Sequence, residues 1–224
     1  MTGYYEEKLS ALRLRRAYEI APPRVQQYLA AEVDHVIQRI DSHDTVLELG
    51  CGYGRVVKQL ARKARFVIGV DTSLASLRLG LEILGNISNY CILNMDAVYL
   101  GFSDRVFDKV VCIQNGISAF HVDQKELIRE SIRVTKRDGT VLFSSYSNRF
   151  WKERLEWFEL QSEAGLLGEI DYEKTCNGAI MCKDGFTATT VQPDQFRLLT
   201  EGFSVDAQIE EVDGSSLFCQ ITTY

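Results

Sequence analysis

Between residues 45 and 145, short apolar runs alternate with segments whose apolar residues recur every three or four positions. The runs cover residues 46–49, 66–70, 90–93, 110–113 and 141–143, and each is continuous. Continuous apolar runs are typical of parallel strands that are covered on both faces, so we expect one sheet. Leu74, Leu77, Leu81 and Leu84 mark one intervening helix, and another begins at Asp123 and ends before Gly139. Right-handed crossovers between such elements give a doubly wound α/β core.

The two flanks of this core have different patterns. Two helical segments, roughly 4–20 and 22–40, precede the first run, and the second carries an apolar stripe that includes Val25, Leu29 and Val33. After residue 146, an aromatic-rich helix is followed by a hairpin that turns at Asp184 and Gly185. A short helix from Pro193 and two strands, about 203–210 and 216–223, complete the pattern.

These elements predict a Rossmann-like, doubly wound, mostly parallel seven-stranded sheet with flanking additions. We divide the chain into an N-terminal helical cap (1–41), a core (42–147 and 193–224) and an α+β insertion after strand five (148–192). The cap and the insertion are expected to form a lid over the carboxyl edge of the sheet.

The composition of the chain argues against three kinds of function: nucleic-acid binding, metal binding and membrane insertion. The 224 residues carry a formal net charge of -6, which argues against a protein that mainly grips a phosphate backbone. The six cysteines form no C-x-x-C pair, so we expect no metal site. No leader pattern and no apolar run of membrane-spanning length occurs. We therefore expect a cytoplasmic protein, a monomer or homodimer, without membrane or nucleic-acid partners.

The stretch T-V-L-E-L-G-C-G-Y-G-R-V, residues 45–56, holds three alternating glycines directly after the first apolar run. Either a sharp turn requires positive φ there, or a ligand approaches the main chain closely. A dinucleotide fingerprint fails, because its last glycine falls on Arg55 or Val57, and no P-loop G-K-[ST] follows. The pattern that remains is E-x-G-x-G-x-G, and the next strand ends in an acid, Asp71.

The chain resembles the class I S-adenosylmethionine-dependent methyltransferases over about residues 42–145, and more weakly over 193–224. Residues 48–54 (E-L-G-C-G-Y-G) resemble the family's motif I, and V-D at 70–71 resembles its acidic second-strand end. N-M-D-A at 94–97 resembles the adenine-contacting loop, and F-D-K-V-V at 107–111 the start of strand four. R-D-G-T-V-L at 137–142 resembles the start of strand five, with Asp138 in place of proline.

This resemblance implies S-adenosyl-L-methionine as cofactor and S-adenosyl-L-homocysteine as product. The cofactor-binding residues that it implies are Glu48, Gly50, Cys51, Gly52, Gly54, Asp71, Thr72, Met95, Asp96, Ala97 and Gln114. Asp71 would accept the ribose hydroxyls and Asp96 the adenine amino group. The alternatives are a helix N-cap for Asp71, a solvated turn acid for Asp96 and a structural acid for Glu48.

The resemblance is strongest to the small-molecule branch of the family, so we expect in-line methyl transfer to a small-molecule nucleophile. After strand four, Asn115 is a candidate positioning group and His121 a candidate base. Six aromatic residues either line the acceptor pocket or attach the flanks to the core: Tyr4, Tyr5, Tyr18, Trp151, Trp157 and Phe158. The [DN]-P-P-[YF] signature of amino-methylating relatives is absent. The alternatives are a protein or RNA methyltransferase and a non-catalytic cofactor-binding regulator.

Overall fold

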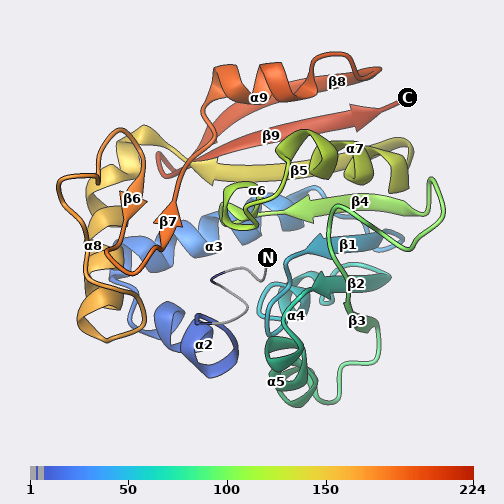
Figure 1. Cartoon of the computed structure of the whole chain (residues 1–224). Helices are drawn as coiled ribbons and strands as arrows, with labels where there is room; N and C mark the ends of the chain where they lie inside the picture. The colour runs from blue at the N-terminus through green and yellow to red at the C-terminus, as the bar shows by residue number, and fades with distance from the viewer. Residues whose placement is uncertain (1–3, 5–7) are drawn as a thin grey trace.

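The computed structural model describes residue 4 and residues 8–224, and its centre is a seven-stranded sheet of order β3-β2-β1-β4-β5-β9-β8 (Figure 1). Five strands are parallel: β1 (Thr45–Leu49), β2 (Phe66–Asp71), β3 (Tyr90–Asn94), β4 (Phe107–Cys112) and β5 (Thr135–Tyr146). The antiparallel pair β8 (Val205–Val212) and β9 (Ser216–Thr223) extends the sheet beyond β5. This order confirms the predicted Rossmann-like, mostly parallel sheet.

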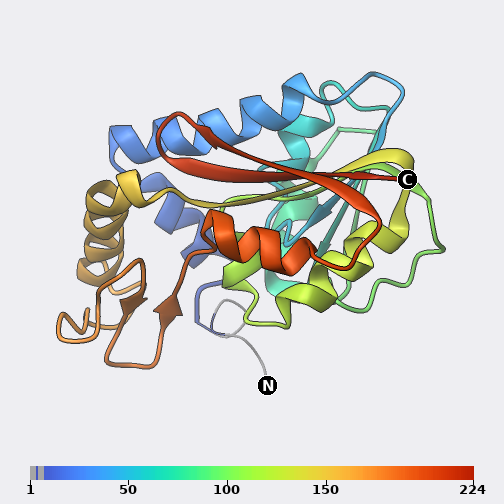
Figure 2. The same ribbon diagram turned by 90° about the horizontal axis from the view of Figure 1, so that it is seen from above.

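Helices cover both faces of the sheet (Figure 2). On one face, α3 (Pro23–Gln38), α4 (Val57–Leu60) and α5 (Leu74–Leu84) bury Val36, Leu60 and Leu77 against the strands. On the other face, α6 (Gly116–Ala119), α7 (Gln124–Val134) and α9 (Pro193–Thr200) bury Ile117, Leu127 and Phe196. Because both faces are covered, the strand residues are apolar on both sides, which explains the continuous runs.

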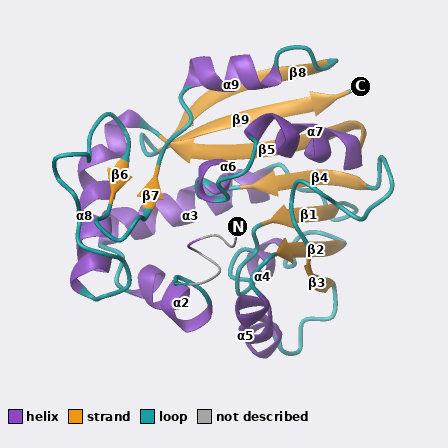
Figure 3. Ribbon diagram, in the orientation of Figure 1, coloured by secondary structure: helices purple, strands orange, loops and turns teal. Residues whose placement is uncertain are grey.

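The two flanking segments meet beyond the carboxyl ends of the parallel strands (Figure 3). They consist of α2 (Ala11–Glu19) on one side and of η1 (Asn148–Phe150), α8 (Trp151–Glu163), β6 (Ile180–Met181) and β7 (Thr187–Ala188) on the other. The indole Nε1 of Trp157 donates to the carbonyl of Ala17 at 2.9 Å, and Arg13 Nη2 donates to the carbonyl of Gly165 at 2.7 Å. Cap and insertion therefore pack on each other over one edge of the sheet.

Two sequence predictions about helices were wrong. The first helical segment was expected to run over roughly 4–20, but residues 8–10 are not helical, and α2 begins at Ala11 after Ser10, which has extended backbone angles. Gly139 was expected to follow the end of a helix, but α7 ends at Val134 and β5 starts at Thr135, so Gly139 lies within β5. A Cβ at Gly139 would approach Asp108 O to 3.0 Å, so the glycine permits close passage of two strands where their register shifts.

Candidate active site

A cavity of about 880 Å³ opens at the carboxyl edge of the sheet, between the loops that follow β1 to β4 and the two flanking segments. Nine of the eleven residues predicted to bind the cofactor line it: Glu48, Gly50, Gly52, Asp71, Thr72, Met95, Asp96, Ala97 and Gln114. Cys51 and Gly54 lie in the same loop but not on the cavity wall. This volume lies within the range typical of small-ligand sites.

The three glycines of the loop after β1 all have positive φ: +72° at Gly50, +53° at Gly52 and +80° at Gly54. A Cβ at Gly50 would also lie 2.5 Å from the ring of Phe120, and one at Gly54 would lie 2.7 Å from Leu84. The turn therefore requires glycine at each position. Since Gly50 and Gly52 also line the cavity, the tight turn and part of the cavity wall occur at the same positions.

Asp71 connects the ends of the first two strands. Its Oδ2 accepts the Gly52 N–H and its Oδ1 accepts the Ser73 N–H, both at 2.8 Å. The N-cap of α5 is Ser73, whose hydroxyl accepts the Ser76 N–H at 3.2 Å. Asp71 is therefore not the helix cap, and its carboxylate lies on the cavity wall, held by the glycine loop.

The loop after β3 forms the next part of the wall. Asp96 Oδ1 accepts the Val98 N–H at 3.0 Å, which fixes the turn, and Met95 and Ala97 flank the acid on the cavity surface. The amide of Asn94 donates to the carbonyl of Thr72 at 2.8 Å and so ties this loop to the one after β2. Asp96 therefore offers a polar partner to the edge of a flat ring, and Met95 and Ala97 offer apolar contacts to its faces.

Glu48 is a buried acid beneath the glycine loop, with 4% of its surface exposed. Burial raises its pKa to about 8, the nearby positive charge of Arg55 opposes the shift, and the negative charge of Asp71 adds to it. Among the described residues, no hydrogen bond to Glu48 Oε2 is formed. A cationic group in the cavity beside Glu48 would favour its ionised form.

Sequence reasoning missed Glu32, which enters the core from α3 and is fully buried. Its carboxylate accepts the Gln114 N–H at 2.6 Å, the Ser144 hydroxyl at 2.8 Å and the Ser216 hydroxyl at 2.6 Å. Burial raises the pKa of Glu32 to about 7, although these three donors favour the charged form. The available signal was an acid on the same stripe as Leu29 and Val33.

Arg55 was also missed as a site residue. Its guanidinium donates to Gln114 Oε1 and lies 4.4 Å from the ring centroid of Tyr18. It therefore places a positive charge behind Gln114 and Tyr18, which line the cavity, although Arg55 itself does not.

The two candidate catalytic residues occupy different positions. Asn115 is buried with φ of 63°; its Nδ2 donates to Thr189 O at 3.0 Å and its Oδ1 accepts the Ser145 hydroxyl at 2.8 Å. It joins the loop after β4 to the insertion and does not line the cavity. His121 is exposed and lines the cavity. The catalytic roles of both residues stay predictions.

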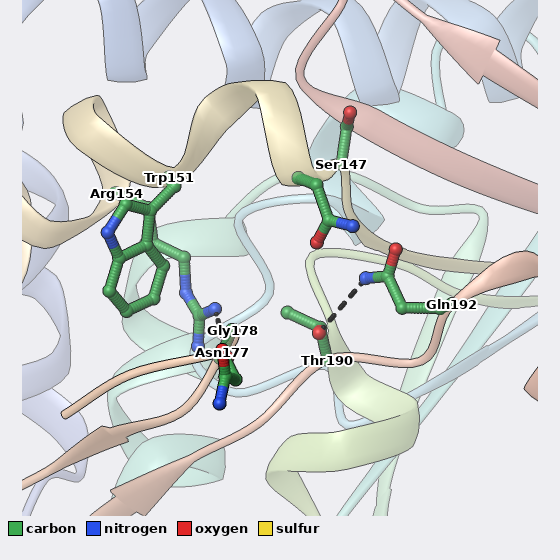
Figure 4. Close-up of a pocket in the computed structure, with 8 residues that line it drawn as sticks. Ser147, Trp151, Arg154, Asn177, Gly178, Thr190 and Gln192 are labelled. Carbon is green, nitrogen blue, oxygen red and sulfur yellow. Dashed lines mark hydrogen bonds between the residues drawn. The ribbon is translucent and has the colours of Figure 1, made fainter. Parts of the chain in front are cut away.

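Four of the six aromatic residues singled out from the sequence line the cavity, namely Tyr4, Tyr18, Trp157 and Phe158. Tyr146 lines it as well. Trp151 instead lines a separate cavity of about 500 Å³ between α8 and the insertion hairpin (Figure 4). Tyr5 lies outside the described residues.

In the part of the chain that the structure describes, no group of three or more His, Cys, Asp or Glu side chains is arranged to hold a metal ion. All six cysteines are free, with Cys176 exposed and Cys182 buried in the insertion. None of the described helices has the length and hydropathy of a membrane span.

A family model described as a methyltransferase domain matches residues 46–139. This segment contains the glycine loop, Asp71 and the N-M-D-A loop. The sequence of residues 46–139 thus matches a methyltransferase domain. The match ends within β5, so α2, α3 and the insertion lie outside it.

Individual proteins are similar over parts of the chain. The ubiquinone biosynthesis O-methyltransferase of Nitrosomonas europaea is 30% identical over 132 residues, which are 57% of this chain and 52% of the relative. The "probable ribosomal RNA small subunit methyltransferase A" of Methanosarcina acetivorans is 33% identical over 76 residues, or 34% and 28% of the two chains. The chain thus spans about half, or less, of the length of these curated relatives.

Among solved structures, the PH0226 protein of Pyrococcus horikoshii OT3 is similar over 99% of this chain and 96% of its own, with a TM-score of 0.62 and 21% identity. At that identity, the likeness shows the fold alone. It extends over the flanking segments as well as the methyltransferase domain.

Proposed function

We propose that this protein transfers a methyl group from S-adenosylmethionine to a small-molecule nucleophile. The supporting observation is one continuous cavity with two unlike ends. One end is formed by the loops of the methyltransferase domain and carries the acids Glu48, Asp71 and Asp96, while the other is formed by α2 and α8 and is lined by aromatic rings. A donor and an acceptor can thus occupy adjacent parts of one enclosed site.

The residues on the donor side fit S-adenosylmethionine. Glu48 can face the amino group of the methionine portion beside Gly50 and Gly52, which line the cavity with it. Asp71 can accept ribose hydroxyls, and Met95, Asp96 and Ala97 can hold the adenine. When bound, this cofactor supplies an electrophilic methyl group on a sulfonium. The chain's own contribution is to hold the two reactants in line and to exclude water.

The shape and charge of the site favour a small acceptor over RNA. Among the described residues, the acids Glu48, Asp71 and Asp96 line the cavity and no lysine or arginine does, and the whole chain carries a net charge of -6. A phosphate backbone is attracted by lysine and arginine instead. The similarity to the ribosomal RNA enzyme covers 34% of this chain, so about two thirds of the chain lies outside it.

We expect the protein to bind S-adenosylhomocysteine with a micromolar dissociation constant and to bind neither NAD nor NADP. The glycine spacing differs from the dinucleotide fingerprint, and the cavity offers acids where a pyrophosphate would need donors. Isothermal titration calorimetry with the three ligands tests this expectation. Tight binding of NAD without any response to S-adenosylhomocysteine would disprove the proposed function.

We also propose that the cap and the insertion act as a lid over the bound cofactor. Tyr4 donates from its hydroxyl to Asp184 at 2.7 Å, and Trp157 donates to Ala17, so the two segments are held by contacts across the cavity. Bound cofactor should slow amide exchange in residues 8–25 and 148–190, because closing the lid buries their main chain. Hydrogen exchange with and without S-adenosylhomocysteine measures this change, and equal protection in both states would contradict the lid.

A further inference from the structure

Gln114 lies in the loop after β4, where the backbone has an uncommon conformation. Gln114 and Asn115 have φ of 57° and 63°, in the left-handed region that residues other than glycine rarely adopt. Such residues persist where neighbouring groups hold them. The Gln114 N–H donates to Glu32 Oε2 at 2.6 Å, and Asn115 is held by bonds to Thr189 and Ser145. Gln114 therefore lines the cavity with a fixed backbone.

Arg55 fixes the orientation of the Gln114 side chain. A guanidinium carries only donors, so the atom of Gln114 that it binds is the oxygen, Oε1. The Tyr18 ring, whose centroid is 4.4 Å from Arg55 Cζ, holds the guanidinium from the side of α2. The other end of the carboxamide, Gln114 Nε2, is buried and forms no hydrogen bond within the described chain. Since a buried donor without an acceptor is costly, an acceptor on a bound ligand would stabilise it.

The amino-acid end of S-adenosylmethionine needs both kinds of partner, because it carries an ammonium and a carboxylate. Glu48 can face the ammonium. In the described part of the chain, no lysine or arginine lines the cavity, so neutral donors have to meet the carboxylate. Gln114 is such a donor, and its partner Arg55 directly follows Gly54, the last glycine of the loop after β1. The Gln114 carboxamide is thus tied to the loop beside which the amino-acid end is expected.

A hydrogen bond from a cation polarises the amide that accepts it. When Arg55 donates to Oε1 of Gln114, the N–H groups on Nε2 become stronger donors. Resting on the proposed function, we propose that Gln114 Nε2 binds the carboxylate of the methionine portion and that Arg55 is its positioning residue. Arg55 sets which end of the carboxamide meets the ligand. It also strengthens a contact in a cavity that it does not line itself.

Two ligands that differ in the amino-acid end test the role of Gln114. S-adenosylhomocysteine and 5′-methylthioadenosine share the adenosine and the thioether, but only the first has the ammonium and the carboxylate. Gln114→Leu is expected to bind S-adenosylhomocysteine at least tenfold more weakly and 5′-methylthioadenosine within twofold of wild type, both measured by calorimetry. Gln114→Glu keeps the shape of the side chain and replaces the donor by an acceptor. It should show the same selective loss, and it keeps the test decisive if Gln114→Leu does not fold.

Arg55→Met tests the positioning role, because methionine keeps an unbranched stem and lacks the donors. We expect at least fivefold weaker binding of S-adenosylhomocysteine and unchanged binding of 5′-methylthioadenosine. In the double variant with Gln114→Leu, the removal of Arg55 should cause no further loss, since Arg55 acts through Gln114. Arg39→Met is the matched control. Arg39 donates to Gln220 Oε1 at 2.9 Å, the same pair of groups at the end of α3 and in β9, and neither residue lines the cavity.

The outcomes separate this proposal from the proposed function. Equal losses for the two ligands in the Gln114 variants, or no loss for either, would mean that Gln114 only shapes the cavity. Losses that add in the double variant, or an equal loss in Arg39→Met, would show that Arg55 does not act through Gln114. Failure of the wild-type protein to bind S-adenosylhomocysteine would instead disprove the proposed function itself.

Discussion

Asp71→Ala is expected to weaken binding of S-adenosylhomocysteine by about a hundredfold or more. A carboxylate can accept several hydrogen bonds at once, and Asp71 accepts the N–H groups of Gly52 and Ser73. Those bonds fix the carboxylate on the cavity wall, where the two ribose hydroxyls of the cofactor are expected to donate to it. Hydrogen bonds to a charged group contribute about 1.5–3 kcal/mol each, so the loss of two weakens binding by at least two orders of magnitude.

Asp123→Ala is the matched control for this variant. Asp123 also accepts two backbone N–H groups, those of Lys125 at 2.8 Å and Glu126 at 3.1 Å, but it lies at the start of α7 and does not line the cavity. Both variants should lose similar local stability, measured by urea unfolding. Only Asp71→Ala should lose affinity, measured by calorimetry. Affinity within threefold of wild type in Asp71→Ala would mean that the carboxylate only shapes the loop.

The five parallel strands could be predicted because helices cover both faces of the sheet. Each strand therefore shows a continuous apolar run that needs no knowledge of its partners. The first residues of β5 were missed because T-K-R-D-G is polar, and this part forms a strand only through pairing with β4 and a hydrogen bond from the Thr135 hydroxyl to Ser131 O at 2.6 Å. Local composition does not encode such pairing.

The donor side of the site was predictable for a related reason. In a parallel sheet, the loops after successive strands meet at one edge, so Gly52, Asp71 and Asp96 had to lie near one another. Glu32 could not be placed in the same way. Its partners Gln114 and Ser144 lie 82 and 112 residues away, and their contacts depend on how α3 packs against the sheet.

The aromatic half of the cavity could be predicted only in part. Its rings were visible in the sequence as candidates, but the sequence did not distinguish Trp157, on the cavity wall, from Trp151, which lies six residues earlier on α8 and lines a different cavity. That distinction depends on the rotation of α8 about its axis, which the contacts of the insertion fix.

Glu32→Gln is expected to stabilise the protein near pH 8 by roughly 3 kcal/mol and to change little near pH 4. The amide can replace all three hydrogen bonds of the acid: its oxygen can accept the Gln114 N–H and the Ser144 hydroxyl, and its nitrogen can donate to Ser216. What the variant removes is the cost of ionising a fully buried carboxyl group. Burial raises the pKa of Glu32 from its usual 4.5 to about 7, which corresponds to roughly 3 kcal/mol.

The sign follows from proton binding. Between pH 4.5 and about 7, the folded protein keeps the Glu32 proton and the unfolded chain has lost it. Stability of the wild type therefore falls as pH rises through this window, by about 1.4 kcal/mol per pH unit. Glu48, with a pKa of about 8, acts in the same direction in both proteins, so the difference between their stability curves isolates Glu32. Urea unfolding at several pH values measures that difference.

Glu32→Ala is the control, since it leaves three donors without their acceptor and should lose stability across the whole range. Parallel curves for wild type and Glu32→Gln would mean that the three hydrogen bonds keep Glu32 ionised in the folded protein, and that its carboxylate adds a permanent negative charge behind Gln114.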